Sequence, residues 1–423
     1  MDIMNKSIYV FPDGLRLVHC AVSGVRSVAI GILTGVGSGN ETAQNNGISH
    51  CIEHMMFKGT DSRSALKISE EFDDIGAQNN AYTSKQTTCY YAVSLSEHVG
   101  KCADVLSDML FNSLFDEEEL DKERKVIDEE ISISEDDGAD MCIDVLSQVY
   151  FGDNALGMPI LGPRKNVAAF KGDDLRRYIA TNYSSTNTVV CLTGNISFAD
   201  AKAITERYFV GRLPRLDRKW LDIPHDSIGG FKSVEKDLEQ AHLALGFPSL
   251  PYRHDKDMAL TAFNAVLGGS MSSRLFQEVR ERNGLAYTVF SSPSTYVNNG
   301  CMCIYAGVNP SQAVAAADMI AKVINEIKRD GITEEELIRG KQQVKSAYVL
   351  SQESTSGMMR QLSKYALFTG ELLDIDEEIA RIDAVTLDDI RYICDIMFDF
   401  DKVSVTYVGK KIKGDIYSAA RGA

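Results

Sequence analysis

The sequence predicts an α+β protein of two homologous domains, each with a mainly antiparallel sheet packed with helices. Two observations support this prediction. The chain has 423 residues, whereas a single hydrophobic core rarely serves more than roughly 250–300 residues. In addition, the order of strand and helix patterns in the first half recurs in the second half, which indicates a duplicated unit.

The first half opens with the pattern of a β-hairpin. Alternating apolar segments at residues 7–11 and 15–18 flank the turn-forming sequence Pro12-Asp13-Gly14. The later segments are recognised by apolar runs and by helical periodicity. They predict strands at residues 27–34, 88–95 and 188–193 and helices at residues 47–57 and 117–134.

Two pairs of segments relate the halves to each other. The acidic start of a long helix at Glu117 recurs at Glu334, an offset of 217 positions. The strand that begins at Cys89 likewise matches the strand that begins at Cys301. We therefore predict domains at 1–215 and 230–423, joined by a linker at 216–229, because Pro214, Pro224, Gly229 and Gly230 cluster with charged residues near 213–230.

Composition limits the classes of function. A formal net charge of -16 repels nucleic-acid phosphates, so no nucleic-acid partner is expected. The nine cysteines are scattered without a CxxC pair, which favours a reducing compartment over a disulfide framework. The N-terminal residues do not have the pattern of a signal peptide, and no apolar run approaches the ~18 residues of a membrane span. We expect a cytoplasmic protein without a membrane partner.

The strongest chemical signal is His50-Cys51-Ile52-Glu53-His54, within the predicted helix 47–57. Histidines four positions apart lie on one helix face, so both rings can bind one metal ion, and Glu53 falls on the same face. A catalytic zinc site needs three protein ligands, an open position for water, and a carboxylate that takes the proton of that water. The HxxEH order is that of the inverzincins, although an ordinary amphipathic helix can produce the same five letters.

A third ligand is expected from a carboxylate on a neighbouring helix. The predicted helix 117–134 is rich in acids, most of which must form a solvated face. Glu123 and Glu130 are seven positions apart and therefore lie on one side of this helix. The residues alone do not decide between Glu129 and Glu130.

Five stretches of the sequence resemble the pitrilysin/insulinase family of metallopeptidases. The similarity is to its short members, which include the catalytic subunit of mitochondrial processing peptidase and related bacterial peptidases. The stretches lie in both halves of the chain and occur in the family's order. They are GISHCIEHMMFKGT (47–60), NNAYTSKQTTCYY (79–91), LDKERKVIDEEISISEDD (120–137), LGMPILG (156–162) and SSRLFQEVRERNGLAYTVFSS (272–292).

The resemblance implies one zinc ion per chain. The family places its glutamate ligand seven residues after the glutamate of a Glu-Arg pair, which selects Glu130 by way of Glu123-Arg124. His50 and His54 complete the implied ligand set. The interval from His54 to Glu130 contains 75 residues, one fewer than in the family, so Glu129 stays the alternative ligand.

The resemblance also implies catalytic roles for two carboxylates of the first domain. Glu53 is the general base on the zinc-bound water, and Glu123 is an acid that orients or polarises the site. The segment Asn80, Ala81, Tyr82 and Thr83 is implied to begin an edge strand to which a substrate peptide adds as an extra strand.

In the second domain, Arg280 and Tyr287 resemble the family's substrate-binding Arg/Tyr pair, which also assists catalysis. Both side chains can donate hydrogen bonds to a scissile carbonyl or a neighbouring peptide oxygen. This domain has no metal site of its own. The segment matching the motif, residues 260–265, lacks both histidines, and Ala347 stands where the first domain has Glu130.

The expected function is a zinc-dependent metalloendopeptidase that hydrolyses unfolded peptides or oligopeptides. Long members of the family carry four such domains and enclose their substrate, so a chain of two domains is half of that clamshell. We therefore expect a homodimer in which Arg280 and Tyr287 of one chain serve the zinc site of the other. The alternative is a non-catalytic structural or partner subunit of a processing-peptidase-like complex.

Overall fold

The computed structural model describes residues 4–216, 227 and 229–422, which divide into two units. Unit 1 contains the described parts of Met1–Ile131, Pro159–Leu221 and Val349–Asp374. Unit 2 contains those of Ser132–Met158, Asp222–Tyr348 and Ile375–Ala423. The predicted linker, residues 216–229, lies mostly outside the described residues.

A six-stranded sheet forms the centre of unit 1, with the strand order β1-β2-β6-β3-β5-β4. The predicted hairpin is present as an antiparallel pair of β1 and β2, and only the pair of β2 and β6 is parallel. β4 forms one edge of the sheet. The strands are β1 (Met4–Val10), β2 (Arg16–Val22), β3 (Ser27–Thr34), β4 (Gln78–Thr83), β5 (Thr88–Leu95) and β6 (Thr188–Gly194).

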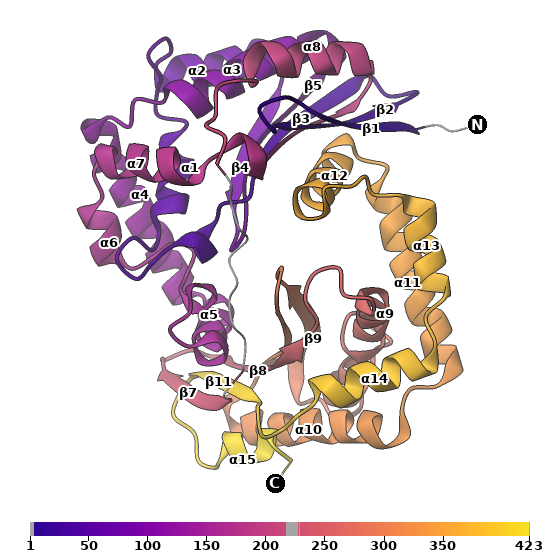
Figure 1. The fold of residues 1–423 in the computed structure, drawn as a ribbon. Helices are drawn as coiled ribbons and strands as arrows, with labels where there is room; N and C mark the ends of the chain where they lie inside the picture. Colours follow the sequence, from indigo (N-terminus) through magenta and orange to yellow (C-terminus); the bar gives the residue numbers. More distant parts are fainter. Residues whose placement is uncertain (1–3, 217–226, 228, 423) are drawn as a thin grey trace. The chain divides into compact units, whose positions relative to one another are not determined.

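β3 and β6 are buried along nearly their whole length, because helices pack on both faces of this sheet. α3 packs against β3 and β5 and α8 against β2, while α12 packs against β3 and β6. In Figure 1, α12 has the orange colour of the C-terminal half although it belongs to unit 1. The helices are α1 (Ile48–Met55), α2 (Ala65–Asp73), α3 (Val99–Asn112), α4 (Glu117–Asp136), α6 (Arg164–Ala169), α7 (Gly172–Asn182), α8 (Phe198–Tyr208) and α12 (Thr355–Thr369).

Unit 2 is built around a five-stranded sheet with the order β7-β11-β8-β10-β9, in which only β7 and β11 are parallel. Its strands are β7 (Gly230–Glu235), β8 (Ala241–Ser249), β9 (Ala286–Thr295), β10 (Gly300–Val308) and β11 (Ser404–Gly409). Its helices are α5 (Gly138–Phe151), α9 (Asp257–Leu267), the π-helix η5 (Phe276–Arg282), α10 (Ala313–Asp330), α11 (Glu334–Ser351), α13 (Ile375–Asp383), α14 (Leu387–Met397) and α15 (Ile416–Ala420).

The two units repeat one topology. Without β1, the order of unit 1 corresponds strand by strand to that of unit 2, including the single parallel pair. The acidic starts at Glu117 and Glu334 open α4 and α11. The fold prediction, two α+β units with mainly antiparallel sheets and packed helices, is confirmed.

Each unit also takes one helix from the opposite half of the sequence. α5 packs against β8 and β11 of unit 2, and α12 packs against β3 and β6 of unit 1. The contacts are specific, because Cys142 of α5 meets Thr406 of β11 and Thr193 of β6 donates a hydrogen bond to the carbonyl of Thr355. The compact units therefore differ from the sequence halves 1–215 and 230–423 in two exchanged segments.

Within the described part of the chain, no helix combines the length and the apolar character that crossing a lipid bilayer requires.

Candidate metal centre

The HxxEH motif lies on α1, an amphipathic helix of eight residues. Its apolar side is buried in the core of unit 1, with Cys51, Ile52 and Met55 nearly inaccessible. The opposite side carries His50, Glu53 and His54, as the helical periodicity predicts. Burial of the apolar side therefore fixes the direction in which the two histidines point.

A buried carboxylate holds the N-terminus of α1. Glu41 accepts hydrogen bonds from the backbone N–H groups of Gly47 (2.7 Å) and Ser49 (2.8 Å) and from the side chain of Asn46 (2.9 Å). Such bonds satisfy donors that a helix start leaves free. Gly47 has φ = 98°, and a Cβ there would lie 2.7 Å from the carbonyl oxygen of Leu161, so the position requires glycine. The hydrogen bonds to Glu41 and the glycine at position 47 thus anchor the loop before α1.

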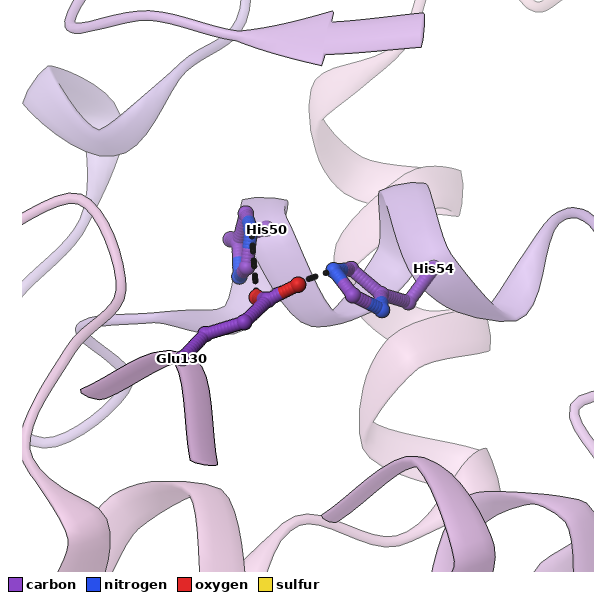
Figure 2. A group of neighbouring side chains, drawn as sticks. All are labelled: His50, His54 and Glu130. Carbon is purple, nitrogen blue, oxygen red and sulfur yellow. Dashed lines mark ion pairs between the residues drawn. The ribbon is translucent and has the colours of Figure 1, made fainter. Parts of the chain in front are cut away.

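Glu130 of α4 meets both histidines (Figure 2). Its Oε2 lies 3.6 Å from His50 Nε2 and 3.4 Å from His54 Nε2. The ligand atoms of these three residues all lie within 4.8 Å of one another. Glu129, the alternative ligand, is exposed and lines a groove with Asp128 and Arg164. The geometry therefore brings Glu130, and not Glu129, to the histidine pair.

The two histidines differ in their electrostatic surroundings. Burial, together with the neighbouring His54, lowers the pKa of His50 to about 4, so its ring is neutral near pH 7. Burial also acts to lower the pKa of His54, but its hydrogen bond to Glu123 and the charges of Glu130, Glu123 and Glu53 raise it overall. A metal must displace a proton from any protonated His54, so affinity for metal falls as the pH falls.

Glu123 contacts Nδ1 of His54, whereas the other ring nitrogen of His54 faces Glu130. The Oε2 of Glu123 lies 3.0 Å from His54 Nδ1, and its Oε1 lies 2.6 Å from Lys58 Nζ. Burial acts to raise the pKa of Glu123, but the hydrogen bonds from His54 and Lys58 outweigh it and lower that pKa. An anionic Glu123 that accepts the Nδ1 proton leaves the Nε2 lone pair of His54 directed at Glu130.

Glu53 stands beside the ligands on the same helix. Thr83 of β4 donates a hydrogen bond to its Oε2 at 2.5 Å. Burial raises the pKa of Glu53, with the Thr83 hydrogen bond and His54 opposing and Glu130 adding to the increase. A carboxylate of raised pKa is a stronger base near neutral pH.

The donor set fits zinc. Two imidazole nitrogens and one carboxylate oxygen are the ligands of many catalytic zinc sites, and three protein ligands leave a fourth position open. Cys51 does not compete as a ligand, because burial raises the pKa of its thiol to about 12 and its side chain belongs to the core. The cluster can therefore hold a divalent metal with an accessible position.

The predicted peptide-binding residues Asn80, Ala81, Tyr82 and Thr83 all lie on β4, the edge strand of the unit 1 sheet. β4 packs against α1, and Thr83 links the strand directly to Glu53. The edge strand therefore lies directly beside the cluster of His50, His54 and Glu130 within unit 1.

Arg280 and Tyr287 belong to unit 2, on η5 and at the start of β9. The Arg280 guanidinium lies 5.5 Å from the ring centre of Tyr287 and 4.7 Å from that of Phe276. Tyr287 is 75% exposed, which is unusual for a tyrosine within a strand. The structure thus brings this pair together on the surface of unit 2, separate from the unit that carries the metal ligands.

The sequence interpretation missed two supporting residues. Lys58 lies beyond the end of α1 at Met55, so helical spacing does not place it against the carboxylate of Glu123. Glu41 gives no sequence signal either, because its role depends on a loop that folds back onto the helix start.

Comparisons with known proteins show the family of this chain. Residues 19–164 match the family described as Insulinase (Peptidase family M16), and residues 169–344 match the Peptidase M16 inactive domain. An uncharacterized zinc protease of Bacillus subtilis is 43% identical over 93% of this chain and 96% of its own length. An uncharacterized zinc protease of Streptomyces coelicolor is 39% identical over 90% of this chain and 84% of its own length.

Two solved structures share the fold. A protease from Helicobacter pylori superposes with a TM-score of 0.88 at 22% identity and covers 96% of this chain and 99% of that one. A peptidase M16 inactive domain from Pseudomonas fluorescens superposes with a TM-score of 0.90 at 17% identity, covering 97% of this chain and 99% of that one. The predicted resemblance is confirmed: the chain belongs to the insulinase family of peptidases, family M16.

Proposed function

We propose that this protein is a zinc-dependent metalloendopeptidase that hydrolyses unfolded peptides or oligopeptides. The observation that supports this most is the cluster of His50, His54 and Glu130 with Glu53 on the same helix face. Relatives named zinc proteases match over nearly the whole chain, which supports zinc as the metal. We further propose one zinc ion per chain and a cytoplasmic location.

The chain's own residues supply binding, orientation and proton transfer. His50, His54 and Glu130 would hold a zinc ion, which would supply Lewis acidity and lower the pKa of a water. Glu53 accepts the proton of the attacking water on its carboxylate and later returns it to the leaving amine. Thr83 orients Glu53, and Glu123 with Lys58 fixes the ring of His54.

The substrate is proposed to bind by strand addition to β4. An edge strand offers unpaired backbone N–H and C=O groups, so it binds the backbone of an extended peptide and tolerates many side chains. Because Thr83 of β4 contacts Glu53, a peptide on this edge passes next to the general base. This placement suits endopeptidase cleavage of unfolded chains.

The test is the substitution Glu53→Gln. It keeps the size of the side chain but removes the base, so turnover of a peptide library should fall by about 100- to 10,000-fold. Zinc measured by mass spectrometry should stay near one ion per chain. A zinc-loaded Glu53→Gln protein with undiminished activity would contradict the proposal.

The same peptide-library assay, carried out on the wild-type protein, tests the non-catalytic alternative. A structural or partner subunit would show no chelator-sensitive peptide hydrolysis in the wild-type protein. The match of residues 169–344 to a domain described as inactive concerns a stretch of the chain that contains none of the three candidate ligands. The intact donor set in unit 1 therefore favours the enzyme.

We also propose a homodimer in which Arg280 and Tyr287 of one chain serve the metal site of the other. Mixing Glu53→Gln chains with Arg280→Ala chains tests this idea, since each preparation alone should be poorly active. A mixed dimer contains one site with both native elements and should recover up to half of the activity per dimer. An absence of recovery despite demonstrated subunit exchange would mean that each site is assembled within one chain.

A further inference from the structure

An exposed arginine lies beside the strands that lead to the β4 edge. Arg360 belongs to α12, the helix that reaches unit 1 from the C-terminal half of the sequence. Its guanidinium carbon lies 5.9 Å from the ring centre of Tyr91 on β5. Tyr91 is in turn the cross-strand partner of Asn80 on β4. The cation is therefore two strands away from a peptide added to this edge.

The alternation of side chains shows which face of the sheet Arg360 occupies. Thr83 points toward α1, because its hydroxyl donates to Glu53. Asn80 is an odd number of positions from Thr83 and so points to the opposite face, as does its partner Tyr91. Arg360 over Tyr91 is therefore on the face away from the metal. A peptide on β4 would direct every second side chain toward that face.

The charge of Arg360 is not neutralised locally. Among the residues that the structure describes, no carboxylate forms an ion pair with it, whereas Arg63 of the same unit pairs with three. Its influence reaches β4 itself. Burial raises the pKa of Tyr82, and the charge of Arg360 acts against this increase. An unpaired guanidinium near an open strand edge offers a fork of N–H donors that suits a carboxylate.

We propose that Arg360 forms an anion subsite for the carboxylate of a peptide bound to β4. The carboxylate belongs to an Asp or Glu side chain that faces away from the metal, or to the peptide's C-terminus. This inference rests on the proposed function, because it needs a peptide on the β4 edge. An anion subsite at Arg360 would give the protein a preference for carboxylate-bearing peptides, which backbone pairing alone does not provide.

The experiment measures peptide binding by fluorescence anisotropy in the zinc-loaded Glu53→Gln protein, so that no turnover is needed. A neutral, C-terminally amidated peptide is compared with versions carrying one Glu or one Gln at each successive position. Glu at alternate positions should bind about three- to tenfold tighter than Gln, as expected for a partly exposed charged pair. A free-acid version of the neutral peptide identifies a terminal carboxylate if it alone gains affinity.

Two further variants, each made in the Glu53→Gln background, decide the assignment. Arg360→Met should reduce the Glu/Gln affinity ratio to about one, and Arg360→Lys should retain part of it. Arg207→Met is the matched control, because Arg207 also lies over a tyrosine ring, that of Tyr208 on α8, and its loss should leave the ratio intact. Binding without any carboxylate preference, or a preference that survives Arg360→Met, overturns the subsite alone. Absence of binding by every peptide contradicts strand addition to β4 as well.

Discussion

Units 1 and 2 share a strand order, yet the side chains between their corresponding helices differ in kind. In unit 1, Glu123 and Glu130 of α4 meet the histidines of α1. At the offset of 217 that relates α4 to α11, the corresponding residues of unit 2 are Gly340 and Ala347. Polar and charged side chains thus occupy the contact between α4 and α1, whereas Gly340 lies at the contact between α11 and α9 and Ala347 is exposed.

The contact at Gly340 shows how closely the helices of unit 2 approach. A Cβ on Gly340 would lie 2.7 Å from the backbone oxygen of Ala262 and 3.2 Å from Val266 Cγ2 on α9. In unit 1, the equivalent position is Glu123, which reaches His54 and Lys58. The comparison teaches that one topology can carry either a cluster of metal-ligating side chains or a closely packed helix contact, depending on a few side chains where the helices meet.

The largest effect should come from removing a ligand from unit 1. Glu130→Ala leaves two histidines, which should weaken zinc binding by on the order of 1000-fold or more and abolish peptide hydrolysis. The converse change, Ala347→Glu in unit 2, should add no zinc because α9 has no histidines there. Competition with a metal indicator dye measures both variants. Full zinc affinity in Glu130→Ala would remove Glu130 from the site.

A smaller effect is expected when the support of the site is altered. Lys58→Met removes the cation that holds one oxygen of buried Glu123, and loss of such a supporting partner lowers metal affinity by about 10- to 100-fold. Lys58→Arg should restore most of the affinity. Lys67→Met removes an exposed pair with Glu70 on α2 and serves as the control, with unchanged zinc affinity. Equal zinc affinity in Lys58→Met and the wild type would refute a positioning role.

The close approach of α11 to α9 at Gly340 can be tested by measuring the stability of variants. Gly340→Ala places a methyl group against the Ala262 carbonyl, and the required shift should lower the free energy of unfolding by about 1–2 kcal/mol. Gly100→Ala on α3 is the control, because an added Cβ meets open space there and alanine favours a helix. Thermal unfolding should show a lower melting temperature for the first variant and an unchanged or higher one for the second. The reverse order would mean that the helices of unit 2 can separate freely.

The smallest effect is expected at the alternative ligand. Glu129 is exposed and faces the groove that Arg164 also lines, so Glu129→Gln should change zinc affinity and turnover by less than about twofold. A loss comparable to that of Glu130→Ala would exchange the assignments of these adjacent glutamates.

Local features of the fold were readable from the sequence, because their causes are local. Residues 27–34 and 88–95 form β3 and β5 as predicted, since apolar runs and β-branched residues determine such strands. The repeat at Glu117 and Glu334 likewise appears as α4 and α11.

The arrangement of the site was only partly readable. Helical spacing brought His50, Glu53 and His54 to one face, but it does not say which of two adjacent glutamates on another helix reaches them. That choice depends on how α4 is rotated against α1, which buried Ile127 and Ile131 determine. The contacts of Lys58 with Glu123 and of Arg360 with Tyr91 join distant segments, and sequence periodicity carries no information about them.

The exchange of α5 and α12 has a consequence for synthesis of the chain. A ribosome releases the N-terminus first, yet the sheet of unit 1 keeps one face without α12 until residues 355–369 have emerged. Until then β3 and β6 present apolar side chains that nascent-chain chaperones recognise. The residues of unit 1 that bear His50, His54 and Glu130 are therefore translated before α12, and the unit can finish folding only once residues 355–369 have been made.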